Sequence, residues 1–328
     1  MSWLDRRSVL LFEGRRRLRR FSTTPRGSFA LQSASSMQVV NERHMSETLR
    51  DVVSLAKPRI TLMVLITTAG GLALAGRVEL MTALYTLLGV ALVVGSANTL
   101  NCWLERDIDR YMTRTQNRPL PAGRLSPTVA LMFGLVLGGI SIPLLTLGVN
   151  KLTGLLAAIA LFSYVLVYTP LKQKTPAALL IGSVPGALPP LIGWTAVTGR
   201  LEWAGIALFG VLFFWQLPHF IAIAIFREAE YTRAGFRVLP AVRGLRVAKV
   251  HALLHSLFLL AASISLVPLR VAGMPFLVVA LILGGGMVAL SIRGFSAPVN
   301  HRWARQMFAA SLVYLPLLFT ALAVDALV

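Results

Sequence analysis

The stretch MTALYTLLGVALVVGSANTLNCWLERDID, residues 81–109, decides the fold of this chain. Residues 81–102 carry no charged side chain, and about 20 such residues suffice for an α-helix to cross the hydrocarbon core of a bilayer. Within that core a single segment can satisfy its backbone hydrogen bonds only as a helix. We therefore predict a membrane-spanning helix that ends among acids at the membrane edge.

The whole chain repeats this pattern. Its 328 residues are 56% hydrophobic and 14% charged, whereas soluble domains carry about a quarter charged residues. The sequence therefore predicts an all-α, polytopic membrane protein of about nine transmembrane helices. Hydrophobic runs broken by glycine, proline or charge place these helices near residues 60–76, 81–102, 126–148, 151–169, 177–197, 203–226, 247–267, 271–292 and 304–325. Residues 51–328 form the expected membrane domain, and residues 1–50 form a basic N-terminal tail that we expect to be disordered.

Lys and Arg residues are distributed very unevenly between the predicted loops. Of the 32, 28 lie in the N-terminal segment or in the loops that follow the second, fourth, sixth and eighth helices. The opposite loops hold only Arg77, Lys151, Arg200 and Arg270. Basic loops stay in the cytoplasm, so we expect a cytoplasmic N-terminus and a C-terminus on the far side. This orientation explains the net charge of +19 without a nucleic-acid partner.

The basic tail leaves the cellular compartment open. Residues 15–36, RRRLRRFSTTPRGSFALQSASS, are rich in Arg and Ser and poor in acids, as mitochondrial transit peptides are. Asp5 and Glu13 interrupt that character, and Met45 opens a segment that looks like a complete bacterial start. We favour the cytoplasmic (inner) membrane of a bacterium, with the mitochondrial inner membrane as the alternative.

Three oxygen-bearing residues follow each other at helical spacing at the end of the second predicted helix. Asn101, Glu105 and Asp109 stand at i, i+4 and i+8, so they share one helix face, whereas Asp107 points elsewhere. Carboxylates at this spacing repel each other by roughly 0.2–0.5 kcal/mol. A Mg²⁺ ion between the carboxylates would turn this repulsion into attraction to the metal. Mg²⁺ binds oxygen ligands and is usually held by one or two carboxylates together with substrate phosphates. The pattern therefore favours a magnesium site.

An ordinary interpretation of the same stretch is a solvated helix end whose acids pair with Arg106, Arg110 and Arg114. The position of the acids decides between the two. Asn101 and Glu105 still belong to the hydrophobic helix, where ionisable groups are expensive and usually functional. We therefore expect the acids to form part of a binding site.

Residues 101–123, NCWLERDIDRYMTRTQNRPLPAG, resemble the first Asp-rich motif of the UbiA superfamily of intramembrane prenyltransferases. Four further islands narrow the resemblance to its haem-farnesylating branch: SLAKPRIT at 54–61, YTPLKQKTP at 168–176, GALPPLIGW at 186–194 and FWQLPHFIAIAIFREAEY at 214–231. The resemblance implies a UbiA-type helical bundle with its active site at the cytoplasmic face. It also implies transfer of the farnesyl group of farnesyl diphosphate, with water, to a vinyl group of haem B, which yields haem O and diphosphate.

The resemblance also assigns roles to individual residues. Mg²⁺ is the implied cofactor, with Asn101, Glu105 and Asp109 as its ligands. The implied catalytic residues are these three and His219. The implied substrate-binding residues are Arg118, Lys172, Tyr168, Arg227 and Glu230.

Two departures from the superfamily pattern bear on the number of metal ions. Glu105 stands where the first motif has Asp, which keeps the charge on a longer side chain. The second motif has His219 at the position of its first acid and Glu230 at the position of its last. We therefore expect one magnesium ion, or two that are loosely held.

The implied partners are farnesyl diphosphate, haem B, the lipid bilayer and downstream proteins of haem A formation or cytochrome oxidase assembly. One alternative is a UbiA-type prenyltransferase that uses a quinone or chlorophyll precursor as its acceptor. Another is a secondary transporter, because RPLPAGR at 118–124 and RVLPAVR at 237–243 suggest two related halves. A transporter would place its acids near the bilayer midplane, whereas these acids lie at the membrane edge.

Overall fold

The computed structural model describes residues 47–296 and 300–326. The predicted N-terminal tail lies outside the described residues, apart from residues 47–50, which begin a helix that runs to Leu55. The described residues from Thr48 onward form one compact unit, which contains the helices given below.

Within residues 47–296 and 300–326, eight helices are apolar and long enough to cross a membrane unbroken, and no strand occurs. A ninth span is obtained if Glu47–Leu55 and Pro58–Leu74, which meet at a 44° bend, are counted as one. The spans are α2 (Pro58–Leu74), α3 (Leu80–Glu105), α4 (Pro127–Gly148), α5 (Lys151–Phe162) with η2 (Ser163–Tyr168) and α6 (Thr169–Leu171), α7 (Ala178–Thr198), α8 (Trp203–Phe226), α11 (Leu245–Ser265), α12 (Met274–Arg293) and α13 (Asn300–Asp325). The prediction of an all-α polytopic membrane protein is confirmed.

The local sequence explains where several helices begin. Pro58, Pro127 and Pro275 occupy the first turns of α2, α4 and α12, where a backbone N–H has no acceptor within the helix. The side chain of Asn150 caps α5 by accepting a hydrogen bond from the Thr153 N–H at 2.9 Å. The loops carry the short helices η1 (Ile108–Tyr111), α9 (Glu228–Arg233), α10 (Leu239–Arg243) and η3 (Gly294–Ser296).

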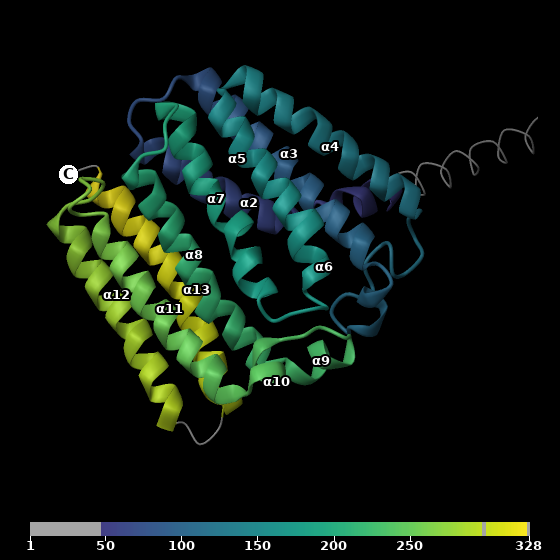
Figure 1. Cartoon of the computed structure of the whole chain (residues 1–328). Helices are drawn as coiled ribbons and strands as arrows, with labels where there is room; N and C mark the ends of the chain where they lie inside the picture. The colour runs from purple at the N-terminus through teal and green to yellow at the C-terminus, as the bar shows by residue number, and fades with distance from the viewer. Residues whose placement is uncertain (1–46, 297–299, 327–328) are drawn as a thin grey trace, which may run out of the picture. The chain divides into compact units, whose positions relative to one another are not determined.

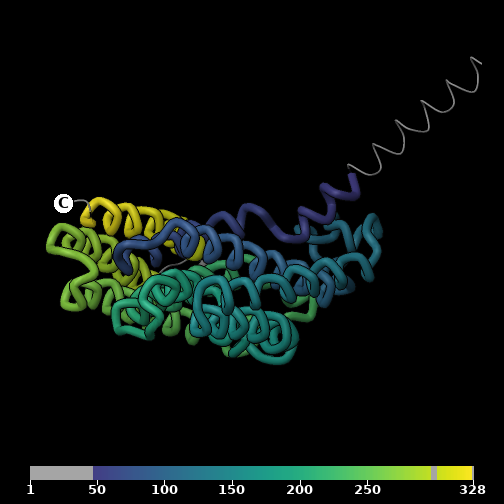
Figure 2. The backbone as a smooth tube through the Cα atoms, turned by 90° about the horizontal axis from the view of Figure 1, so that it is seen from above, coloured from purple at the N-terminus to yellow at the C-terminus, as the bar shows by residue number. Residues whose placement is uncertain are grey.

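Helix α7 lies at the centre of the bundle. Of its most apolar window 67% is buried, against 28–50% for the other unbroken spans. It packs against α2, α5 and α8 (Figure 1). Seen from above, the C-terminal helices, green to yellow, gather on one side and the blue and teal helices on the other (Figure 2). Because α7 contributes to the hydrophobic cores of both groups, it joins the two halves of the domain.

The backbones of α2 and α7 approach closely at one glycine of each helix, Gly71 and Gly193. A Cβ atom on Gly71 would lie 2.1 Å from the carbonyl oxygen of Pro190, and one on Gly193 would lie 2.1 Å from that of Thr68. Small residues of this kind let membrane helices approach closely. The close contact also supports α7 itself, which stays helical through three internal prolines.

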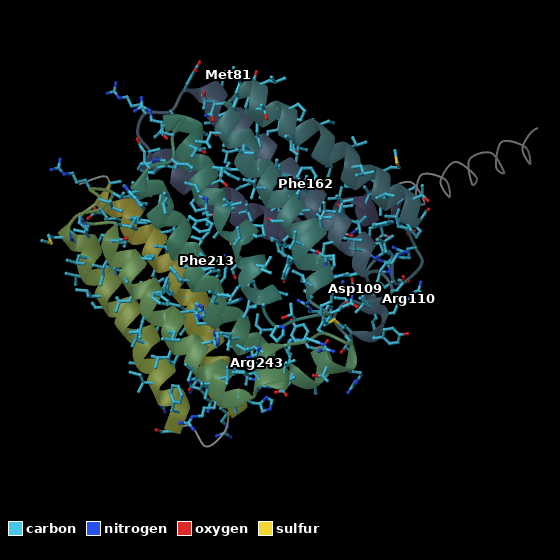
Figure 3. All side chains as sticks on the ribbon, in the orientation of Figure 1. Met81, Asp109, Arg110, Phe162, Phe213 and Arg243 are labelled. Atoms are coloured by element: carbon cyan, nitrogen blue, oxygen red, sulfur yellow. The ribbon has the colours of Figure 1, made fainter. Side chains whose placement is uncertain are left out.

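The two ends of the bundle differ in charge. Asp109, Arg110 and Arg243 lie toward one end, whereas Met81 lies at the opposite end (Figure 3). The first end carries the basic loops, with α9, α10 and η1, and the positive-inside rule predicts that it faces the cytoplasm; it is called the cytoplasmic end on that expectation.

This orientation predicts the outcome of a reporter experiment. A topology reporter fused after α13 should report from the non-cytoplasmic side, because an odd number of spans separates it from the cytoplasmic N-terminal segment. Truncating the fusion after α12, at Arg293, removes one span and should reverse the readout. A cytoplasmic readout from the full-length fusion would contradict the nine-span topology.

Candidate active site

A cavity of about 1190 Å³ lies between α2, α3, α7, α8 and α13. Its walls are mostly apolar, and charged groups gather toward the cytoplasmic end of the spans. Of the nine residues predicted to form the site, seven line this cavity: Asn101, Glu105, Asp109, Arg118, Tyr168, Lys172 and Arg227. The predicted acids, cations and aromatic ring therefore share one cavity, although they come from segments far apart in the sequence.

The three oxygen-bearing residues do not lie on one helix. Helix α3 ends at Glu105, and Asp109 belongs to the 3₁₀ turn η1 that follows. The predicted shared helix face is therefore wrong for Asp109, because the chain turns before it reaches i+8. The turn nevertheless brings Asp109 to the cavity, and Asn101, Glu105 and Asp109 are only 2%, 6% and 2% exposed. Asp107, predicted to point away from these three residues, is exposed.

Each buried acid is paired with a cation from the basic loops. The Lys172 amine donates to Oε1 of Glu105 at 2.8 Å, and Arg118 donates to Oδ2 of Asp109 at 2.7 Å. The Lys57 amine donates to Oδ1 of Asn101 at 3.3 Å. The ordinary interpretation is therefore wrong for Glu105 and Asp109, although Arg106 does lie 3.7 Å from the exposed carboxylate of Asp107. The expected repulsion between the acids is offset by protein cations.

Lys172 is held in place by more than its carboxylate partner. Its amine lies 4.6 Å from the centroid of the Tyr168 ring, and its carbonyl accepts a hydrogen bond from the Arg237 N–H at 3.0 Å. Burial alone would lower the pKa of Lys172, but Tyr168 and the Glu105 carboxylate raise it above its usual value. Lys172 is therefore a fixed positive charge at the polar end of the cavity.

A π-helical turn positions the Tyr168 ring. The turn η2 ends at Tyr168, and such turns within α-helices occur often at functional sites. The ring packs on bare backbone, since a Cβ atom at Gly182 would lie 2.3 Å from Cε2 of Tyr168. The absence of a side chain at Gly182 thus gives Tyr168 its place beside Lys172.

His219 is the predicted catalytic residue that the cavity does not include among its lining residues. Its Nδ1 lies 2.8 Å from Oγ of Ser311, and its ring packs on Trp215 and Phe308 at centroid distances of 5.1 and 4.8 Å. Both of these aromatic residues line the cavity. His219 therefore supports the aromatic wall from behind and lies apart from the acids.

Glu230 also stands behind a lining residue. It accepts a hydrogen bond from Arg227 at 2.8 Å and one from Oγ1 of Thr113 at 3.4 Å. Arg227 lines the cavity, and Thr113 follows η1. Glu230 thus connects the loop after α8 to the loop after α3.

Sequence reasoning missed Lys57, Asn98 and Gln216, which also line the cavity. Lys57 lies within SLAKPRIT and Gln216 within FWQLPHF, so both belong to islands that carried the family resemblance. The charge of Lys57 was assigned to membrane orientation. Gln216 is the only amide side chain in the apolar helix α8, and this polar residue within a span is the signal that could have identified it.

The oxygen donors at the polar end fit a magnesium ion in part. Lys172 and Arg118 contact one oxygen each of Glu105 and Asp109, which leaves the second carboxylate oxygen of each for a further ligand. Within the described ranges, no cluster of three or more His, Cys, Asp or Glu side chains is placed to hold a metal. Two carboxylates and an amide suit Mg²⁺ only when a ligand such as diphosphate completes the coordination.

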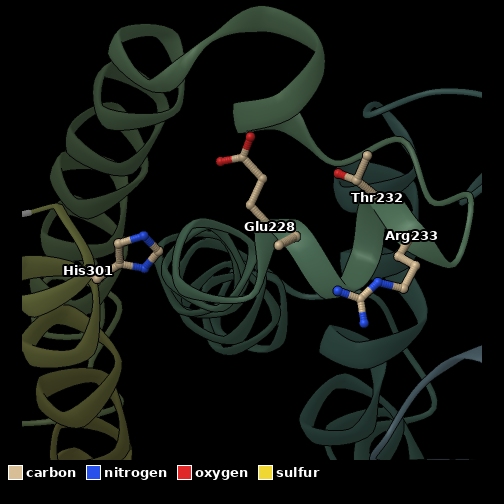
Figure 4. A pocket seen from close by; sticks show the side chains of 5 residues that line it. Glu228, Thr232, Arg233 and His301 are labelled. Carbon is tan, nitrogen blue, oxygen red and sulfur yellow. The ribbon is translucent and has the colours of Figure 1, made fainter.

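A second pocket, of about 490 Å³, lies between α9 and the start of α13. Glu228, Thr232 and Arg233 line it from α9, and His301 faces them from α13 (Figure 4). It contains none of the nine predicted site residues. His301, which falls just before the predicted ninth span, lies in the first turn of α13.

Comparison with known proteins places this chain in a family. The sequence model of the UbiA prenyltransferase family matches residues 64–313. A protein named protoheme IX farnesyltransferase from Myxococcus xanthus (strain DK1622) is 49% identical over 276 residues, which cover 84% of this chain and 94% of that protein. One of the same name from Anaeromyxobacter dehalogenans (strain 2CP-C) is 50% identical over 275 residues, which cover 84% and 93%.

Solved structures share the fold at much lower identity. A structure of digeranylgeranylglyceryl phosphate synthase is 18% identical with a TM-score of 0.75, and covers 85% of this chain and 99% of that chain. A UbiA homolog from Archaeoglobus fulgidus bound to DMAPP and Mg²⁺ is 17% identical with a TM-score of 0.60, and covers 84% and 99%. These likenesses establish the helical bundle and nothing finer.

The buried ion pair predicts the effect of removing one acid on stability. Glu105→Gln leaves the largely buried Lys172 amine without its carboxylate, so the free energy of unfolding should fall by about 3 kcal/mol. A lower melting temperature of the purified protein in detergent measures this. Adding Lys172→Met should restore most of the loss, whereas Asp107→Asn, at an exposed 3.7 Å pair, should change little. A melting temperature unchanged by Glu105→Gln would show that the pair contributes no stability.

Proposed function

Because the chain belongs to the UbiA prenyltransferase family, we propose that it farnesylates haem B in the cavity, at its polar end. The chain is a prenyltransferase: it transfers the farnesyl group of farnesyl diphosphate, with water, to a vinyl group of haem B and releases haem O and diphosphate. Identities of 49% and 50% to two relatives named protoheme IX farnesyltransferase support these substrates over a quinone-type acceptor. The observation that carries the proposed site is the set of paired acids and cations at one end of a large apolar cavity.

Lys172 and Arg118 bind the diphosphate. Each donates to one carboxylate and has further N–H groups that can donate to phosphate oxygens. Asn101, Glu105 and Asp109 would hold Mg²⁺, which when bound neutralises the charge that builds on the diphosphate as the C–O bond breaks. The relative from Archaeoglobus fulgidus, described as bound to DMAPP and Mg²⁺, supports this use of a divalent metal.

The farnesyl group lies along the apolar wall beyond the diphosphate. On α3, Ala97, Val94 and Val93 line the cavity at successive positions that lead away from Asn101. The apolar wall excludes water from the bond that breaks. The ring of Tyr168, which lies against the Lys172 cation, can also stabilise positive charge on the allylic carbon.

The acceptor occupies the side of the cavity formed by α8 and α13. Aromatic rings line this side: Trp215, Phe220, Phe308 and Phe319. Their flat, apolar surfaces suit a porphyrin macrocycle. Arg237 and Arg305 line the cavity as well, and guanidinium groups are well suited to the two propionates of haem B.

The enzyme works within a membrane. Its relatives are bacterial proteins, which supports the cytoplasmic (inner) membrane of a bacterium over the mitochondrial alternative, with the polar end of the cavity on the cytoplasmic side. Haem O then passes to downstream proteins of haem A formation or cytochrome oxidase assembly.

The proposed function is tested by incubating purified enzyme in lipid with haem B, farnesyl diphosphate and Mg²⁺. Mass spectrometry of the extracted haem should detect a product that carries one farnesyl group and one added water. Omitting Mg²⁺ or farnesyl diphosphate should abolish that product. Unmodified haem B in the complete reaction, with active control enzyme in parallel, would reject the proposal.

Variants of the acids test the site assignment in the same assay. Glu105→Gln and Asp109→Asn should each lower turnover by roughly 100-fold or more, because each removes charge that positions the metal and diphosphate. Asp107→Asn should retain activity, because this carboxylate is exposed and faces away from the cavity. If Asp107→Asn were inactive while Glu105→Gln and Asp109→Asn were active, the assignment of the metal to Glu105 and Asp109 would be wrong.

A further inference from the structure

Gln216 is a buried amide on α8 that borders the cavity and is only 7% exposed. Its Nε2 donates to the backbone carbonyls of Leu212 at 3.0 Å and Ser183 at 3.3 Å. Because both partners are acceptors, the nitrogen and the oxygen of this amide are assigned without ambiguity. Oε1 lies against α7, where a Cβ atom at Gly186 would be 2.1 Å from it.

Among the described residues, Oε1 of Gln216 is a hydrogen-bond acceptor without a donor. In the described part of the chain, no N–H or O–H group donates to this oxygen alongside the two bonds that Nε2 makes. Among the described side chains only Thr99 has an enclosed polar atom without a partner, so Oε1 of Gln216 is not enclosed and is open to the cavity. Since Gln216 lines the cavity, a molecule within the cavity can supply the missing hydrogen.

A chain of contacts locates this oxygen relative to the diphosphate. Glu105 pairs with Lys172, Lys172 lies over Tyr168, and Tyr168 packs against Gly182 of α7. Gly186, which Oε1 touches, follows one helical turn later, about 6 Å along α7. Gln216 therefore lies one turn deeper than the ring beside the diphosphate site, on the side where an allylic carbon would react.

The reaction requires a water molecule in this apolar region. Haem O carries a hydroxyl group on the former vinyl carbon, so water has to reach a carbocation within a cavity whose other walls near Gln216 are apolar. These walls are formed by Pro185, Pro189, Leu212 and Trp215. Building on the proposed function, we infer that Oε1 of Gln216 holds the water molecule that becomes the hydroxyl oxygen of haem O.

The C–O bond of farnesyl diphosphate breaks and its electron pair leaves with diphosphate. The π electrons of the vinyl group form the new C–C bond to the farnesyl carbon, which leaves a cation on the vinyl carbon attached to the macrocycle. A lone pair of the water molecule forms the C–O bond at that carbon. The proton that water then loses passes to the released diphosphate, a base in the same cavity.

Loss of the held water should change the product rather than only the rate. Without a nucleophile in place, the carbocation loses a proton and leaves a farnesylated alkene, which is lighter than haem O by one water. Gln216→Met keeps the length of the side chain but replaces the amide oxygen with a thioether sulfur, which is only a weak acceptor. The ratio of alkene to hydroxylated product should rise by about tenfold, as expected for one lost hydrogen bond to a reacting group. Gln216→Glu keeps an acceptor oxygen, so its ratio should stay near that of the wild type.

The experiment uses full-length enzyme in lipid, haem B, farnesyl diphosphate, Mg²⁺ and ¹⁸O-labelled water. Label should enter the product of the wild type and of Gln216→Glu. Asn98→Leu is the matched control, because Asn98 also lines the cavity, and donates to the carbonyl of Ala56 at 3.4 Å, but lies one turn from Asn101 at the diphosphate end. Its product ratio should not change.

Three outcomes would count against this inference or its premise. Unchanged product ratio in an active Gln216→Met enzyme would reject the role of Gln216 while leaving the proposed function intact. A shifted ratio in Asn98→Leu alone would move the water to the other amide. Absence of any farnesylated haem from the wild type would instead reject the proposed function itself. If Gln216→Met does not fold, Gln216→Leu replaces it, with the same expectation for the ratio.

Discussion

The hydrocarbon of a bilayer offers no hydrogen-bond partner, so every polar group inside the bundle has to find one within the protein. Hydroxyl groups within the spans meet this demand locally, as Thr68, Thr86 and Ser256 do by donating to carbonyls one turn earlier in their own helices. Indole nitrogens do so across helices, since Trp215 donates to the carbonyl of Ser311. Among the described side chains, only Thr99 has a sealed polar atom without a partner. Oε1 of Gln216 differs from these groups, because it has no donor within the described residues and borders the cavity, where a bound molecule can donate to it.

The same demand governs the charged groups. The acids that the sequence places at the end of α3 are buried, and each has a basic partner from a cytoplasmic loop. A lone buried charge would be costly, and a closely hydrogen-bonded pair reduces that cost. The arrangement keeps acids and cations together at one end of the cavity, where diphosphate and metal require both signs of charge.

Much of this architecture follows from the sequence, because long apolar segments can only be helices and basic loops fix their orientation. The residues of the active site can be predicted from the sequence only in part. Asn101 and Glu105 were identifiable because polar residues at the end of an apolar helix are unusual, but the turn that carries Asp109 off the helix leaves no signal in the spacing. His219 shares an island of resemblance with Gln216, yet it packs behind Trp215 while Gln216 borders the cavity. Which of the two faces the cavity depends on the packing of α7 and α13 against α8, and no local pattern encodes that.

The distance in sequence between the partners of the two ion pairs has a consequence for biogenesis. Arg118 follows Asp109 by nine residues, so this pair can form as soon as the first cytoplasmic loop is made. Lys172 follows Glu105 by 67 residues and two further spans. At about 5–20 residues per second of synthesis, Glu105 waits roughly 3–13 seconds for its cation. An acid at the bilayer midplane would spend that interval in hydrocarbon, whereas one at the cytoplasmic end of α3 can wait in water. The edge position that suits catalysis therefore also lets the helix enter the membrane before its partner exists.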